Sequence, residues 1–197
     1  MYTHRVKKSS LAKKPVISAL QDMFLGRAGS RRLSKMRYLT HSALIAAIYA
    51  TLTIGLAPIS FGQQQIRVAE ALSILPAFTP AAVPGLFIGC VISNSMSFLG
   101  LPDLIFGSFA TLASAIITAF IARPLKERSV LLQAVMLPLP SVLANAFVVG
   151  AMLAVLLDIP FAAAALGVLA GQALSCYGIG VPLFLALRAY ARRARIY

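Results

Sequence analysis

ISFGQQQIRVAEAL, residues 59–72, interrupts the most apolar half of the chain with three consecutive glutamines and an opposite-charge pair, Arg67 and Glu70. Long and almost wholly apolar segments lie on both sides of it. The chain is 59% hydrophobic and only 12% charged, whereas about a quarter of the residues of a soluble domain are charged. Apolar runs of this length predict a membrane protein of several helices, with this stretch between two of them.

The charges are segregated along the sequence. Ten of the 18 Lys and Arg residues fall in the first 37 positions, Arg123, Lys126 and Arg128 form an internal cluster, and four arginines lie close to the C-terminus. Basic clusters that bound apolar runs are typical of the cytoplasmic side of a membrane protein. The net charge of +13 therefore indicates topology, and no nucleic acid partner is needed to explain it.

Prolines and turn residues divide the apolar part of the chain into predicted spans. The breaks are Pro58, residues 76–80, the GLPD turn at residues 100–103, the basic residues 123–128, and Asp158 with Pro160. A helical span takes about 20 apolar residues, so the second of the resulting helices is short. The predicted helices cover residues 39–57, 68–78, 81–98, 102–122, 130–157 and 161–187.

The basic clusters also fix the number of spans. Six helices place the N-terminus, residues 123–128 and the C-terminus on the cytoplasmic side, whereas five would move residues 123–128 outside. Residues 59–72, Asp103 and Asp158 then lie at outer loops. We therefore expect an all-α polytopic membrane protein.

Three regions follow from this topology. They are a basic cytoplasmic leader over residues 1–37, a six-helix membrane domain over residues 38–188 and a basic cytoplasmic tail over residues 189–197. Residues 16–25 of the leader fit either a short amphipathic helix on the membrane surface or a disordered segment, and both alternatives stay open.

The sequence carries no motif of an enzyme or of a metal site. It has no P-loop, no HExxH and no GxSxG elbow, and both histidines, His4 and His41, lie at or before the first span. Cys90 and Cys176 fall inside apolar runs, where neither a disulfide nor a metal set is expected. We therefore expect neither catalysis nor a cofactor.

Ionisable groups inside a membrane protein are costly and so mark candidate functional sites. Arg67 and Glu70 are three residues apart, which places them on one face at the outer entrance of the second helix. Two interpretations are open. They form an interfacial ion pair in contact with water, or they bind a polar ligand from outside, with Gln63, Gln64 and Gln65 reaching over the site as a loop.

Three amide side chains, Asn94, Asn145 and Gln172, stand within apolar runs. Such a side chain either joins helices by hydrogen bonds or contributes to a ligand site. With a carboxylate and aromatic rings, amides would suit a flat heterocycle, whose edge they would read and whose N–H groups the carboxylate would accept. The aromatic candidates are Phe61, Phe78, Phe98, Phe147 and Tyr177.

The first span carries overlapping pairs of small residues, Ala43 with Ala47 and Ala46 with Ala50. This spacing allows another helix to approach closely. The other helix belongs either to this chain or to a partner subunit.

Four segments resemble one known family. They are ALIAAIYATLTIGLAPISFGQQQIRVAEALSILPAFTPAAVPGLFIGCVISN (residues 43–94), LPDLIFGSFATLAS (residues 101–114), LANAFVVGAML (residues 143–153) and YGIGVPL (residues 177–183). They are similar to the QueT family of predicted queuosine-precursor transporters, the substrate-binding S-components of energy-coupling factor (ECF) transporters. The resemblance extends over residues 37–188 and does not include the basic leader.

The resemblance implies a six-helix S-component of the bacterial plasma membrane, with both ends cytoplasmic. ATP hydrolysis would come from two ATPase subunits, joined to this chain through a transmembrane coupling subunit. Ala43, Ala46, Ala47 and Ala50 would form the surface that docks on the coupling subunit, and the loop after the first helix would close over the ligand. The ligand implied is a 7-deazaguanine such as preQ1, preQ0 or queuine.

Roles for the candidate residues follow from that ligand. A carboxylate would accept the adjacent N–H donors of its guanine-like edge, with Glu70 as first choice and Asp103 as second. Asn94, Asn145 and Gln172 would address the carbonyl and the pyrrole N–H, and Arg67 would keep Glu70 ionised or close the loop. Two other functions remain alternatives: a solitary secondary transporter for a small heterocycle or vitamin, and a non-transporting membrane scaffold.

Overall fold

The computed structural model describes residues 26–61 and 66–193, and within these ranges the chain forms helices and no strands. It divides into two compact units, residues 1–38 and 39–197, and each is described by itself. Residues 1–25, which include the predicted amphipathic segment 16–25, and the loop glutamines 63–65 lie outside the described residues. Residues 26–38 are helical and form the beginning of α2.

The membrane unit consists of six apolar helical segments in the places that the sequence predicts. Residues 35–55, 103–125, 130–157 and 161–193 are long and apolar enough to cross a membrane, while residues 68–77 and 82–94 are shorter. The predicted all-α polytopic membrane protein is thus confirmed. The elements are α2 (Gly26–Gly55), α3 (Ala57–Ser60), η1 (Val68–Ala77), α4 (Ala82–Asn94), η2 (Asp103–Gly107), α5 (Ser108–Leu125), α6 (Val130–Met136), α7 (Leu139–Ala144), η3 (Asn145–Val149), α8 (Gly150–Leu157), α9 (Phe161–Ala173), η4 (Leu174–Gly180) and α10 (Val181–Arg193).

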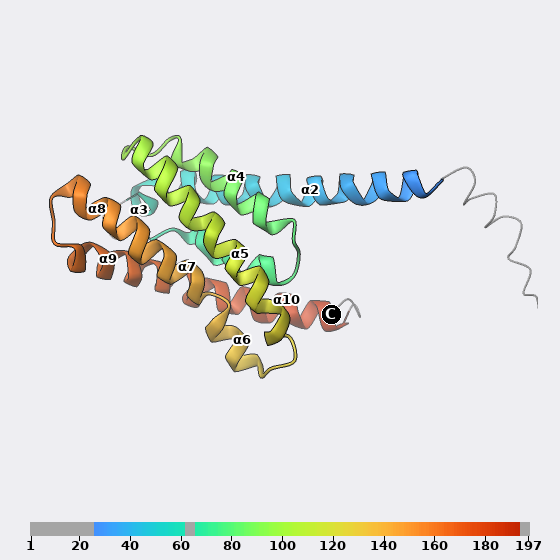
Figure 1. Ribbon diagram of the computed structural model, residues 1–197. Coiled ribbons are helices and arrows are strands. Elements are labelled where there is room, and N and C mark those ends of the chain that lie inside the picture. Colours follow the sequence, from blue (N-terminus) through green and yellow to red (C-terminus); the bar gives the residue numbers. More distant parts are fainter. Residues whose placement is uncertain (1–25, 62–65, 194–197) are drawn as a thin grey trace, which may run out of the picture. The chain divides into compact units, whose positions relative to one another are not determined.

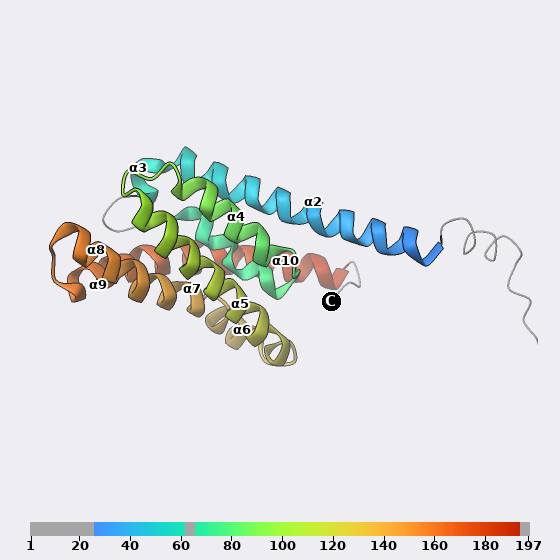
Figure 2. The ribbon, with the colours of Figure 1, turned by 45° about the horizontal axis from the view of Figure 1, so that its top comes forward.

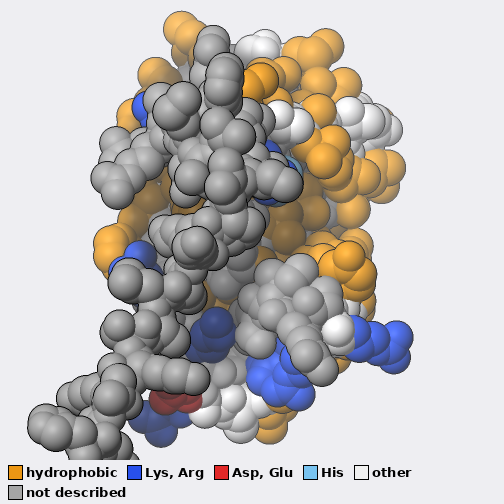
Figure 3. All heavy atoms as spheres, turned by 90° about the vertical axis from the view of Figure 1, so that its right-hand side faces the viewer, with side chains coloured by type: hydrophobic (Ala, Val, Ile, Leu, Met, Phe, Trp, Pro, Cys, Tyr) orange, Lys and Arg blue, Asp and Glu red, His pale blue; other side chains and the backbone are white. Residues whose placement is uncertain are grey.

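Successive segments of the membrane unit run in opposite directions (Figure 1). The turns at residues 95–102 and 158–160 lie at one end, with α3. The basic turn at residues 126–129 and the end of α10 lie at the other, where Figure 3 shows Lys and Arg side chains gathered. This separation agrees with the predicted topology, in which the basic end is cytoplasmic.

Large apolar side chains cover the outside of the unit. Val155 is 84% exposed, Leu131 75% and Phe120 67%. A soluble domain rarely shows so many large apolar groups over neighbouring helices, whereas a bilayer is the solvent in which such a surface is stable.

The second segment, η1, is a 3₁₀ helix with Pro76 inside it. Its ten residues span about 20 Å at the 3₁₀ rise of ~2.0 Å per residue, against about 15 Å for an α-helix of the same length. This is still short of the ~30 Å hydrocarbon core. Glu70, Ser73 and Ile74 are all buried, so η1 lies inside the bundle and its neighbours supply the contact with lipid.

Glycines let α4 pack closely against α2, and the two helices lie side by side in both ribbon views (Figure 1, Figure 2). A Cβ atom at Gly89 would stand 2.8 Å from the Ala46 carbonyl oxygen and 2.8 Å from Tyr49 Cβ. Ala46 and Ala50 are accordingly buried, while Ala43 and Ala47 are exposed. The predicted alanine surface is therefore divided, and only Ala43 and Ala47 are open to another chain.

Gly89→Ala tests this contact. The added methyl group has no room beside the α2 backbone, so we expect the free energy of unfolding to fall by about 1–3 kcal/mol, the usual effect of overpacking. Thermal unfolding in detergent measures it. Gly55→Ala is the matched control, because a Cβ there meets nothing within 4 Å, and an equal loss in both variants would contradict the packing.

Candidate functional site

Arg67 and Asp103 form a buried ion pair between the start of η1 and the first residue of η2. Arg67 Nη2 lies 3.0 Å from both Asp103 Oδ1 and Asp103 Oδ2, and the two side chains are 1% and 0% exposed. The guanidinium carbon also lies 5.5 Å from the centre of the Phe61 ring, which in turn packs edge-on against Phe98. Both side chains are thus buried, so the interpretation that Arg67 lies at an interface in contact with water is wrong.

Glu70 accepts hydrogen bonds from three other helices. Tyr49 Oη of α2 is 2.5 Å from Oε1, Thr111 Oγ1 of α5 is 3.2 Å from Oε1, and Ser141 Oγ of α7 is 2.6 Å from Oε2. The Glu70 side chain is completely buried. Hydroxyl groups therefore take the place of water around this carboxylate.

The predicted ion pair between Arg67 and Glu70 is not formed. Residues three apart do share a face within a helix, but Arg67 precedes η1 and has an extended backbone, with φ −89° and ψ 99°. Its side chain leaves the η1 face and meets Asp103 instead. An interfacial pair in contact with water is excluded for the same residues by their burial.

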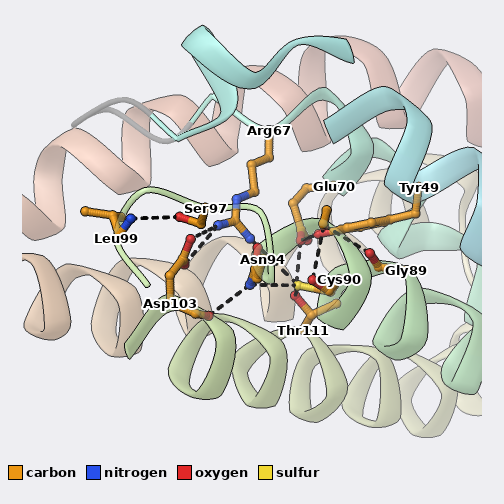
Figure 4. Close-up of polar contacts among 11 residues, drawn as sticks. Tyr49, Arg67, Glu70, Gly89, Cys90, Asn94, Ser97, Leu99, Asp103 and Thr111 are labelled. Carbon is orange, nitrogen blue, oxygen red and sulfur yellow. Dashed lines mark hydrogen bonds and ion pairs between the residues drawn. The ribbon is translucent and has the colours of Figure 1, made fainter. Parts of the chain in front are cut away.

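Asn94 and Cys90 of α4 join the two carboxylates into one polar centre (Figure 4). Asn94 Nδ2 donates to the Asp103 carbonyl oxygen at 2.9 Å and lies 3.4 Å from Cys90 Sγ. Cys90 Sγ also contacts Arg67 Nη1 at 3.7 Å and Thr111 Oγ1 at 3.4 Å. The polar centre is defined here as Tyr49, Arg67, Glu70, Cys90, Asn94, Asp103, Thr111 and Ser141.

The remaining predicted site residues lie at the border of the polar centre or away from it. Asn145 Nδ2 donates to the Ser141 carbonyl oxygen at 3.0 Å. Gln172 is connected to the centre through Cys176, whose Sγ lies 3.9 Å from Gln172 Oε1 and 3.5 Å from the Glu70 carbonyl oxygen. Tyr177 does not join it, because its hydroxyl donates to the Val135 carbonyl oxygen of α6 at 2.9 Å.

The sequence analysis missed four members of the polar centre: Cys90, Tyr49, Thr111 and Ser141. The last three each carry a single hydroxyl inside an apolar run, and hydroxyls are common in membrane helices as contacts between helices. Of the hydroxyl residues, Tyr49 was the easiest to identify from the sequence, because it is the one tyrosine within the alanine-rich first span.

Charged and hydrogen-bonded groups held at the centre of an apolar helical bundle are typical of membrane transport proteins. The comparisons with known proteins give the particular family: the model of the QueT transporter family matches residues 39–189, so the chain belongs to this family. The chain is therefore a multi-pass membrane protein of a transporter family, and the resemblance noted in the sequence is confirmed.

The chain is similar over part of its length to a curated relative. This relative is the queuosine precursor transporter QueT of Lactococcus lactis subsp. cremoris (strain MG1363), which is 42% identical over 72 residues. This stretch is 36% of the present chain and 42% of the relative, so the match spans less than half the length of either protein. No solved structure is similar enough to be matched.

Asp103→Asn tests the buried ion pair. The variant leaves the Arg67 charge without a counter-ion, so we expect the free energy of unfolding to fall by about 3–5 kcal/mol, measured as a lower midpoint of thermal unfolding in detergent. Asp158→Asn is the matched control, since Asp158 is exposed and its left-handed backbone, φ 51°, also suits asparagine. Equal midpoints for the two variants would contradict the pairing.

Proposed function

We propose that this chain is the substrate-binding membrane subunit of an ATP-driven ECF-type importer for a queuosine precursor, a 7-deazaguanine such as preQ1, preQ0 or queuine. The observation that carries the proposal is the polar centre, which places two carboxylates, Glu70 and Asp103, and an arginine in the buried interior of a bundle whose outside is apolar. Membership in the QueT transporter family and the name of the Lactococcus relative support the same substrate class.

The chemistry of the polar centre suits a guanine-like base. Such a base carries adjacent N–H donors, for which a carboxylate is the natural acceptor. The Glu70 carboxylate offers about four lone-pair directions, and three hydroxyls use three of them. One direction remains for a single N–H donor of the ligand, such as its amino group, and Asn94 of the same polar centre supplies an amide for a second polar group.

ATP-driven import by this chain would require further protein subunits. The sequence carries no nucleotide-binding motif, so ATP would be hydrolysed by two ATPase subunits joined through a transmembrane coupling subunit. Ala43 and Ala47 are exposed on α2, and two small residues four apart allow close helix packing. We propose this alanine pair as the docking contact with the coupling subunit.

Substitution of the alanine pair separates ligand binding from transport. In cells that also produce the ATPase and coupling subunits, we expect Ala43→Leu with Ala47→Leu to abolish uptake of radiolabelled precursor, because bulky side chains keep the helices apart. Binding of the precursor by the purified chain should be unchanged. Ala170→Leu, at an exposed alanine of α9, is the control and should transport normally.

The same uptake measurement distinguishes the other functions. Uptake by this chain without ATPase subunits, driven by a proton gradient, would identify a secondary transporter and contradict the proposal. A thermal stabilisation screen tests guanine, preQ0, preQ1, queuine and common vitamins. If none of these compounds stabilises the protein, the result would favour a non-transporting scaffold.

Glu70→Gln tests the role of the carboxylate in binding. We expect the affinity for the precursor to fall by about tenfold or more, because a charge-assisted hydrogen bond is replaced by a neutral one with a misplaced donor. Titration calorimetry on the purified protein measures the affinity. Glu127→Gln, at an exposed carboxylate, is the matched control, and an unchanged affinity in a folded Glu70→Gln variant would remove Glu70 from the ligand site.

A further inference from the structure

Two buried polar atoms of the polar centre have no hydrogen-bond partner among the described residues: Arg67 Nε, a donor, and Asn94 Oδ1, an acceptor. Both side chains are 1% exposed. An unsatisfied polar group in such a place costs about 1–3 kcal/mol, so native structures pair nearly all of them. An orphan donor and an orphan acceptor in one centre are suited to a ligand that supplies both partners.

The partners that these side chains do have leave the two atoms free. Arg67 uses Nη2 for Asp103, and its Nη1 contacts only a sulfur atom, Cys90 Sγ, at 3.7 Å. Asn94 uses its Nδ2 for the Asp103 carbonyl oxygen. Asp103 thus holds both side chains in place through different atoms, without satisfying Arg67 Nε or Asn94 Oδ1.

Gly107 shows that the two side chains come close together. The position that a Cβ atom would take at Gly107 is 2.7 Å from Asn94 Nδ2, 2.9 Å from Asp103 Oδ1 and 3.7 Å from Arg67 Nη1. Any side chain here would push the amide and the carboxylate apart, so glycine is required. Figure 4 shows the guanidinium and the Asn94 amide next to each other, beside the Asp103 side chain.

A donor beside an acceptor is the complement of a lactam edge, in which a carbonyl oxygen adjoins a ring N–H. We propose that Arg67 and Asn94 form the subsite for the lactam edge of a heterocyclic base: the carbonyl oxygen accepts from Arg67 Nε, and the ring N–H donates to Asn94 Oδ1. The inference rests on the proposed function and adds which edge of the base is read, and by which residues. It gives Arg67 a direct contact with the ligand in addition to its pairing with Asp103.

The contact between Arg67 and the lactam edge is tested by comparing two ligands, with and without that edge, in the wild type and in an Arg67 variant. 7-Deazaguanine has the lactam edge, whereas its 6-O-methyl ether keeps the ring, the pyrrole N–H and the amino group but lacks the lactam N–H and carries an ether oxygen in place of the carbonyl. Arg67→Lys keeps the cation for Asp103 but removes the second and third nitrogens of the guanidinium. Titration calorimetry gives the four dissociation constants of the full-length wild type and the variant.

We expect wild type to bind 7-deazaguanine about 10–100-fold more tightly than the ether, the range for a buried hydrogen-bonding edge that loses its match. In Arg67→Lys this ratio should fall by about threefold or more, because the carbonyl oxygen of 7-deazaguanine loses its donor while the contact of the lactam N–H with Asn94 remains. Arg123→Lys, an exposed arginine, should keep the wild-type ratio. If Arg67→Lys does not fold, Asn94→Ala takes its place and should reduce the ratio in the same way.

Equal binding of base and ether by wild type, or a ratio that survives Arg67→Lys, overturns the lactam subsite and leaves the proposed function standing. Failure of wild type to bind 7-deazaguanine, preQ0, preQ1 and queuine overturns the proposed function, and the subsite with it.

Discussion

Arg67 and Asp103 are 36 residues apart in the sequence, and each would be a buried charge without a partner if the other were removed. Taking an ion out of water costs several kcal/mol even after the protein relaxes, so the bundle holds these two groups only as a pair. The pair fixes the start of η1 against η2. Glu70 then meets hydroxyls of α2, α5 and α7, and the remaining helices pack around a centre that these contacts define.

Hydropathy and charge predict the helical segments well, because both depend on the bilayer rather than on particular contacts. The partners inside the bundle depend on side-chain direction, which the sequence does not state. Arg67 meets Asp103 because its own backbone is extended. Hydroxyls are equally ambiguous: Ser93 and Ser175 donate to carbonyls of their own helices, Gly89 and Gly171, whereas Ser141 donates to Glu70. The residue type alone does not separate these two cases.

The polar centre combines two kinds of carboxylate in a small volume. Asp103 is neutralised by a cation, while Glu70 is surrounded by neutral hydroxyl donors. When both acids are ionised, the two carboxylates and the Arg67 guanidinium together carry a formal net charge of one negative unit. This balance favours ligands with several N–H donors over anionic ones.

The shortness of η1 has a consequence for how the protein is built into the membrane. Ten residues with a carboxylate among them are too short to partition into a bilayer as an independent span. Tyr49 is synthesised before Glu70, but Thr111 and Ser141 come 41 and 71 residues later. Glu70 therefore gains its full set of hydroxyl partners only after α7, in the other half of the protein, has been synthesised.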